Sequence, residues 1–251
     1  MGARTESTMT ESTMTESART ESTKIEPSML LATIERTRVR LHFAGGVGGA
    51  SSRRARQLRG AVASAVRDSP LFHQHDGEGR PLYRYPRIQY RWDEGVGEIV
   101  GWKEGADALE SFRWDALTIR LDGRKVSIEE IDVKRERVAF SLLKRLRRHH
   151  LRSPVLVFSQ KTYSRYRAMN EAEQILERDR LLVAQSLIAL RGLGIECPAT
   201  LYAAFCDVKA YQCPYKEQKL LGFKGTILSN IEMPSGFALG RATSHGYGVI
   251  Q

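Results

Sequence analysis

The sequence predicts an α+β fold in which two βαββαβ units follow one another along the chain. Strand-like and helix-like hydrophobic patterns alternate in that order in the first half, and much of the order recurs in the second. Glycine and proline breakers separate the patterns, and 41% hydrophobic residues are enough for packed cores. A length of 251 residues suits two units of ordinary domain size.

The beginning of the chain differs in composition from the rest. Residues 5–23 read TESTM-TESTM-TESAR-TEST, a five-residue repeat without an apolar period. Such a repeat has almost nothing to bury, so we expect residues 1–28 to form a disordered tail and Met29 to be the true start of the protein. Residues 1–28 carry three basic and five acidic side chains, so the remaining 36 basic and 24 acidic side chains leave a net charge of +12.

The first predicted unit begins with a strand over residues 39–43, where Val39, Leu41 and Phe43 alternate onto one face. Residues 51–67 predict a helix with an apolar side at a period of 3.6 residues. Its other side carries Arg53, Arg54, Arg56, Arg59 and Arg67. The further elements are strands over 83–91 and 97–102, a helix over 105–112 and a strand over 117–121. This is the order of a ferredoxin-like fold, and we predict such a domain over residues 29–125.

The second predicted unit contains the strongest helix signal of the chain. Asn170 begins that helix, Glu173 completes a capping box three residues later, and Gly192 ends it. Strand patterns occupy residues 126–140, 155–158, 201–209, 220–229 and 247–250. We therefore predict a second ferredoxin-like domain over residues 126–251, with a glycine-rich loop near its end.

Charge and composition exclude several classes of protein. The formal net charge of +10 makes a polyanion the first partner to consider. The sequence has neither an apolar run of about 18 residues nor a signal-peptide pattern, so we expect a cytoplasmic protein without a membrane partner. Its three cysteines lack the spacing of a disulfide framework or of a zinc site.

A pair of histidines, His73 and His75, lies between the arginine-rich helix and the segment that contains Tyr83 and Tyr85. Imidazole exchanges protons near neutral pH, and reactive groups often lie on loops, so this pair is a candidate for acid–base chemistry. A solvated loop without a function is equally compatible with the pattern. A two-metal hydrolase site would need further clusters of ligands, which the sequence lacks.

A second candidate site is the glycine-rich segment 236–250, which includes Gly240, Gly246 and Gly248. Glycines allow a backbone to approach a phosphate and to turn its amides toward an anion. The spacing matches neither a Walker loop nor a dinucleotide fingerprint, and a tight hairpin without a ligand explains it equally well.

Basic side chains form the third candidate. They occur on the face of the 51–67 helix, in the run 144–152, and in residues 161–167, where Lys161 and two arginines alternate with tyrosines. This mixture suits a nucleic-acid path, because cations neutralise phosphates and aromatic rings stack on bases. Charge runs are often merely solvated faces, but several of them in one basic chain favour binding.

Together, these features resemble the RAMP superfamily of CRISPR-associated proteins. Gly240, Gly246 and Gly248 match its C-terminal G-x5-G-x-G loop, although Ala238 replaces a glycine that usually precedes the loop. Within the superfamily the chain is similar to the sixth Cas family, the endoribonucleases that cut CRISPR precursor RNA, and in particular to its b subtype. The stretches that carry this similarity are 58–60, 72–75, 85–90, 99–101, 104–106, 158–161 and 191–195.

The resemblance implies a RAMP-type pair of ferredoxin-like domains and RNA cleavage without a metal or another cofactor. The ribose 2′-OH attacks the adjacent phosphate, which leaves a 2′,3′-cyclic phosphate and a 5′-OH end. It further implies His75 as the main proton-transfer residue with His73 as its partner, Tyr83 or Tyr85 as an orienting or donating group, and Arg67 as a source of positive charge. The residues that we expect to bind the repeat RNA are Arg53, Arg56, Arg59, Arg67, Lys161, Gly240, Arg241, Gly246 and Gly248.

The expected partner is CRISPR repeat RNA, with a CRISPR effector complex or a homodimer as an assembly that the sequence leaves open. Two other functions also stay open at this point. One is a non-catalytic RNA-binding subunit of the same superfamily, and the other is a metal-dependent phosphohydrolase.

Overall fold

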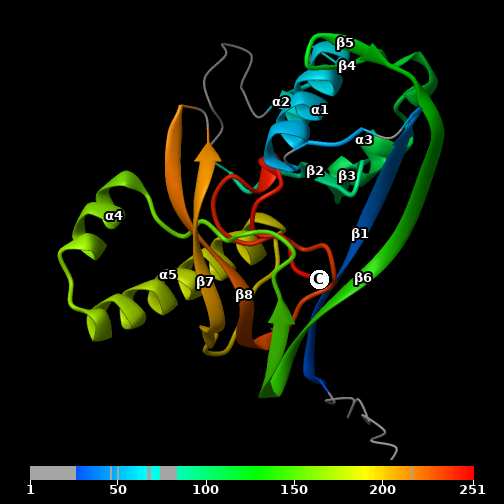
Figure 1. Cartoon of the computed structure of the whole chain (residues 1–251). Coiled ribbons are helices and arrows are strands. Elements are labelled where there is room, and N and C mark those ends of the chain that lie inside the picture. Colours follow the sequence, from blue (N-terminus) through cyan, green and yellow to red (C-terminus); the bar gives the residue numbers. More distant parts are fainter. Residues whose placement is uncertain (1–26, 46, 50, 67–68, 74–83, 216) are drawn as a thin grey trace, which may run out of the picture.

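A computed structural model describes residues 27–45, 47–49, 51–66, 69–73, 84–215 and 217–251 (Figure 1). Its main feature is a six-stranded antiparallel sheet in the order β2-β3-β1-β6-β8-β7. The strands of this sheet are β1 (Pro27–Phe43), β2 (Ile88–Asp93), β3 (Val96–Trp102), β6 (Ile128–His150), β7 (Ala203–Tyr215) and β8 (Gln218–Glu232). The helices are α1 (Ser51–Ala65), α2 (Pro70–His73), α3 (Glu104–Glu110), α4 (Gln160–Arg167) and α5 (Glu171–Gly192), with short 3₁₀ turns η1 (Trp114–Ala116) and η2 (Thr243–His245).

The long strand β6 belongs to both ferredoxin-like units. Its first part pairs with β1, so that β1, α1, β2, β3, α3 and β6 form one βαββαβ unit. Its last part pairs with β8 from Arg147 to His150, and helices α4 and α5 lie between β6 and β7 in the chain. Figure 1 shows β1 and β6 as two long strands that run side by side from one unit to the other. The α+β class and the ferredoxin-like units that the sequence predicted are thus confirmed.

Three predicted strands have a different role in the structure. Residues 247–250 make only isolated bridges, in which Val249 pairs with Ala238 and Ile250 with Leu151. The strand predicted at 117–121 is shortened to β4 (Ile119–Leu121), which pairs with β5 (Arg124–Val126) in a separate hairpin. Asp122 and Gly123 both have positive φ, as a tight two-residue hairpin turn requires. In the main sheet, β6 is the fourth strand of the first βαββαβ unit. Residues 155–158 form no strand, because Val155 makes an isolated bridge with Phe223 instead.

The predicted domain boundary at residues 125 and 126 precedes the shared strand β6. The division into 29–125 and 126–251 stays a prediction, because the sheet is continuous across it. The predicted tail overlaps β1, which begins at Pro27, and the rest of that tail lies outside the described residues. In the described part of the chain, no helix is long and apolar enough to cross a membrane.

The predicted helices form where their signals lie. In α5 the side-chain oxygen of Asn170 accepts a hydrogen bond from the Glu173 amide at 3.0 Å, and the Asn170 amide donates to the Glu173 carboxylate at 2.9 Å. This capping box satisfies two amides that a helix start leaves unpaired. In α1 the apolar side chains of Ala55, Leu58 and Val62 are buried in one cluster with Val39, Leu41 and Phe43 of β1.

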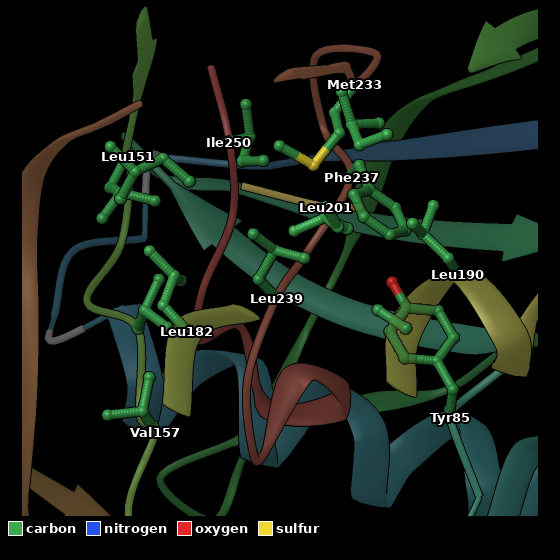
Figure 2. Close-up of a cluster of buried hydrophobic side chains, with 14 of the residues drawn as sticks. Tyr85, Leu151, Val157, Leu182, Leu190, Leu201, Met233, Phe237, Leu239 and Ile250 are labelled. Atoms are coloured by element: carbon green, nitrogen blue, oxygen red, sulfur yellow. The ribbon is translucent and has the colours of Figure 1, made fainter. Parts of the chain in front are cut away.

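A second core joins the two units. Figure 2 shows Tyr85, from the segment before β2, beside Phe237 of the C-terminal segment and Leu190 of α5. The Phe237 ring lies 5.8 Å from that of Tyr85 and meets the Trp102 ring of β3 edge to face at 5.8 Å. Because side chains from both units fill this core, the glycine-rich segment is held in a fixed position relative to the first unit.

Candidate active site

The end of the glycine-rich segment packs directly on α1 and β2. Gly246 has a φ of +85°, and a Cβ added there would lie 3.2 Å from the carbonyl oxygen of Tyr90 and 3.4 Å from the Cβ of Ala55. A side chain at this position would therefore push the segment away from the helix. The close approach brings His245, at the end of η2, next to the basic face of α1.

Arg59 of α1 connects this segment with the end of α2. Its Nη1 lies 3.2 Å from Nε2 of His245, and its Nη2 donates to the carbonyl oxygen of His73 at 2.8 Å. A guanidinium has donors alone, so Nε2 of His245 accepts and Nδ1 carries the ring proton. The hydroxyl of Ser244 lies 3.1 Å from that Nδ1, and the Tyr215 ring meets the imidazole edge to face at 5.2 Å. The His245 ring is thus contacted by Arg59, Ser244 and Tyr215.

His73 ends α2 and is half-buried. Its Nε2 lies 2.8 Å from the carbonyl oxygen of Val66, which is a hydrogen bond that this nitrogen donates. In the neutral ring, Nδ1 then carries the lone pair and is the nitrogen that can accept a proton. Three other predicted residues, His75, Tyr83 and Arg67, lie outside the described residues.

Tyr85 does not reach this site. Its ring is buried in the second core, and its hydroxyl donates to the carbonyl oxygen of Ala238 at 2.8 Å (Figure 2). Burial raises the pKa of the phenol above its ordinary value. A hydroxyl that is already bonded inside the core cannot orient or protonate a substrate, so the predicted role of Tyr85 at the reacting phosphate lacks support from the structure.

A cavity of about 260 Å³ opens beside His245. The residues that line it are Ser52, Arg53, Arg56, Pro214, Tyr215, His245 and Tyr247. Arg53 and Arg56 are exposed on α1, and Arg53 also pairs with Asp122 of the β4–β5 turn at 2.5 Å. The cavity therefore combines two guanidinium groups with an imidazole and tyrosine side chains, which suits an anionic ligand that carries a ring.

Two predicted RNA-binding glycines have a structural role. Cβ atoms added at Gly240 and Gly248 would lie 2.7 Å from the Leu156 carbonyl oxygen and 1.8 Å from that of Leu239. The amides of Gly246 and Gly248 donate to carbonyl oxygens of the protein itself. These amides are not available to a phosphate, and the positive φ angles serve a tight turn of the chain. The geometry agrees with the hairpin that the sequence left as an alternative to an anion nest.

Buried arginines hold the start of the same segment. Arg36 of β1 and Arg91 of β2 donate to the backbone carbonyl oxygens of residues 235 and 236. Glu98 of β3 accepts from Arg91 at 3.4 Å and from Arg152 at 2.7 Å. Burial by itself raises the pKa of the Glu98 carboxyl, but the two arginines outweigh burial and lower this pKa to about 2. The carboxylate is therefore charged at neutral pH and fixes Arg91 against the segment.

Two family models match the chain. The Cas6b N-terminal domain matches residues 37–139, and the Cas6b C-terminal domain matches residues 141–251. The chain belongs to the Cas6b family. The two matched regions meet inside β6, the strand that both units share.

Known proteins resemble this Cas6b chain at low sequence identity. A solved structure titled "Crystal structure of Cas6b" is 21% identical and superposes with a TM-score of 0.76 over 87% of this chain and 99% of that one. A structure titled "Crystal structure of CRISPR RNA processing endoribonuclease Cas6b" is 20% identical, with a TM-score of 0.66 over 87% of this chain and 98% of that one. An uncharacterized protein of Methanocaldococcus jannaschii is 25% identical over 126 residues, which are 50% of this chain and 80% of that protein.

Two other predicted binding residues of this Cas6b chain, Lys161 and Arg241, do not line the cavity beside His245. Figure 1 places α4, with Lys161, on the opposite side of β7 from α1. Arg241 is exposed on the glycine-rich segment and lines a second cavity together with residues of α4. Among the described residues, no group of three His, Cys, Asp or Glu side chains is arranged to hold a metal ion.

Sequence reasoning missed His245 and Tyr215. His245 lies between two glycines of the G-x5-G-x-G spacing, so its position in that loop was the available signal. Tyr215 precedes the β7–β8 turn and had no signal of its own. Its contact with His245 joins elements that are far apart in the sequence.

Proposed function

We propose that this protein is a metal-independent endoribonuclease that cleaves CRISPR precursor RNA within its repeats and so produces guide RNAs for antiviral defence. Membership of the Cas6b family supports the substrate class. The observation that carries the proposal is the double contact of Arg59, whose guanidinium touches both the His245 imidazole and the backbone of His73.

The proposed reaction is a transesterification. A histidine of the 73/75 pair removes the proton from a ribose 2′-OH, and the 2′-oxygen forms a bond to the adjacent phosphorus. The bond from phosphorus to the 5′-oxygen breaks, and the second acid–base group gives that oxygen a proton. The products are a 2′,3′-cyclic phosphate and a 5′-OH end, so neither water nor an oxidant enters this step.

Charge develops on the non-bridging phosphate oxygens while the phosphorus is five-coordinate. Arg59 is half-buried and held at two points, so its guanidinium is oriented before the substrate binds. Arg53 and Arg56 line the neighbouring cavity and supply further positive charge for the RNA backbone. We assign binding of the repeat RNA to this surface and proton transfer to His75 and His73.

The test is a cleavage assay on the repeat RNA of the same genome with EDTA present. We expect the wild type to cut at one phosphate, and His73→Ala with His75→Ala together to abolish cutting while RNA binding is retained. His42→Ala is the matched control, because the alternation of β1 puts the half-buried His42 on the face opposite to Leu41 and Phe43, which share a cluster with α1. Cleavage that survives the double substitution would refute these roles, and binding without cleavage by the wild type would identify a non-catalytic RNA-binding subunit.

The proposal also concerns assembly and location. We expect the RNA-bound protein to act in the cytoplasm, either in a CRISPR effector complex or as a homodimer. Light scattering of the protein with and without repeat RNA distinguishes one copy from two.

A further inference from the structure

A larger cavity of about 390 Å³ lies between α4, the β7–β8 hairpin and the glycine-rich segment. The residues that line it are Phe158, Ser159, Gln160, Tyr163, Tyr215, Gln218, Lys219, Leu220, Leu221, Arg241 and Ala242. Its volume is in the range of about 300–1,000 Å³ that small-molecule sites occupy, so it can take a group of nucleotide size.

The cavity adjoins the candidate active site. Tyr215 lines both this cavity and the smaller one that contains Arg53, Arg56 and His245. The two cavities are therefore neighbours that share Tyr215. An RNA strand whose phosphate lies at His245 can place an adjacent nucleotide beyond Tyr215.

An aromatic ring forms one wall of the cavity and is held from behind. Tyr163 of α4 is half-buried, and its ring lies 5.8 Å from that of Phe158. Phe158 in turn contacts Tyr166 at 4.5 Å and Phe223 of β8 at 6.1 Å. A ring that is braced by a buried cluster is a platform on which a base can stack without ordering the side chain first.

The backbone of the cavity is also formed in advance. A capping box fixes the first turn of α4, because the Thr162 amide donates to the Ser159 hydroxyl at 3.2 Å and the Ser159 amide donates to the Thr162 hydroxyl at 2.8 Å. The Arg241 amide donates to the carbonyl oxygen of Leu156 at 2.8 Å, which fixes the opposite wall.

The polar lining matches a nucleotide. Gln160 and Gln218 each offer a carbonyl oxygen and an amide nitrogen, which can pair with the edge of a base. Lys219 and Arg241 offer positive charge for a phosphate, and none of the described lining residues is acidic.

We propose that this cavity binds an unpaired nucleobase of the RNA substrate, next to the phosphate that is cut, with Tyr163 as the stacking platform. The inference rests on the proposed function to the extent that the RNA is the same substrate. It adds a site that reads one nucleotide outside any paired region of the repeat.

The test asks whether a substitution in the protein and the removal of one base from the RNA affect the same contact. Repeat RNAs that carry one abasic nucleotide at each position in turn are bound to the wild type and to Tyr163→Ala. We expect Tyr163→Ala to weaken binding of intact RNA about tenfold or more, and Tyr163→Phe to bind within about threefold of the wild type because it keeps the ring. At one abasic position the wild type should lose the same factor, and Tyr163→Ala should lose nothing further.

Two controls keep the result interpretable. Tyr202→Ala removes an exposed tyrosine outside both cavities and should leave binding unchanged. Gln160→Ala changes an exposed lining residue without disturbing the packing of α4. It should weaken binding of the intact RNA, and the abasic nucleotide at the position that couples to Tyr163 should remove this loss. The proposal is overturned if the losses from Tyr163→Ala and from the abasic nucleotide multiply at every position, or if neither Tyr163→Ala nor Gln160→Ala weakens binding.

The same samples separate this proposal from the proposed function. If the coupling at one position is found but the wild type does not cut in EDTA, the base site stands and the nuclease proposal fails. If the wild type cuts and no position couples to residue 163, the nuclease proposal stands and the base site fails.

Discussion

The Nη1 atom of Arg59 lies 3.2 Å from Nε2 of His245, although 186 residues separate them in the sequence. The same guanidinium donates to the backbone of His73 at 2.8 Å. One side chain of α1 therefore contacts both the glycine-rich segment and the end of α2. The next two predictions follow from this arrangement.

Arg59→Lys should lower the single-turnover cleavage rate about 10²-fold. Lysine keeps the positive charge, but its single ammonium group cannot hold both contacts in the planar geometry of a guanidinium. Because the charge remains, we expect the Kd for repeat RNA to change by less than about threefold. Arg113→Lys, an exposed arginine paired with Asp115, serves as the control and should cut at the wild-type rate. Equal losses in binding and in rate would contradict an oriented role for Arg59.

Substitutions of His245 should distinguish positioning from proton transfer. Since Nε2 accepts from Arg59, we expect His245 to orient this guanidinium, so His245→Ala should cut about tenfold more slowly. His245→Gln offers a carbonyl oxygen in place of Nε2 and should recover most of the rate. Cleavage rates from pH 5 to 9 make the distinction clear. If His245→Gln is as slow as His245→Ala and changes the shape of the pH profile, His245 transfers a proton instead.

Glu98 should make the free energy of unfolding depend on pH in the acidic range. Its pKa is lowered to about 2 in the folded state, so its contribution is fully present above the unfolded pKa of about 4.5 and is lost as pH falls toward 2. We expect Glu98→Gln to reduce the free energy of unfolding by about 3 kcal/mol at pH 7. Denaturant titrations at several pH values should show this difference shrink below pH 4.5. Glu129→Gln, at an exposed position of β6, should show no such trend.

Gly248→Ala should destabilise the fold by at least about 2 kcal/mol. The added Cβ would lie 1.8 Å from the Leu239 carbonyl oxygen, at a φ of +73°. Gly123→Ala is a matched control, because Gly123 has a φ of +80° and nothing within 4 Å of an added Cβ. Thermal unfolding of both variants separates the collision from the backbone strain. Equal losses in the two variants would mean that the close approach at Gly248 has no cost.

Local signals explain which parts of the fold could be predicted from the sequence. The capping box at Asn170 and the stop at Gly192 act within a few residues, and α5 has the predicted bounds. The alternation of Val39, Leu41 and Phe43 reflects burial against one face, which the structure confirms. The strand at 117–121 was misplaced, because the choice between a hairpin with β5 and a place in the main sheet depends on the whole sheet.

The candidate site was harder to predict, because long-range contacts decide the role of each side chain. The sequence around Tyr85 does not show whether its ring faces solvent or the core. In the structure, Phe237 from the other end of the chain packs on this ring. From composition alone, Arg36 and Arg91 would be assigned to the charged surface. In the structure both are buried and donate to backbone carbonyl oxygens. His245 has a role next to Arg59 through a contact that no local pattern encodes.

The most direct test of the central claim is the chemical analysis of RNA ends after cleavage in EDTA. We expect the upstream fragment to carry a 2′,3′-cyclic phosphate and the downstream fragment a 5′-OH, as mass spectrometry of the products would show. Cleavage that requires an added divalent metal and leaves a 3′-OH with a 5′-phosphate would contradict the account.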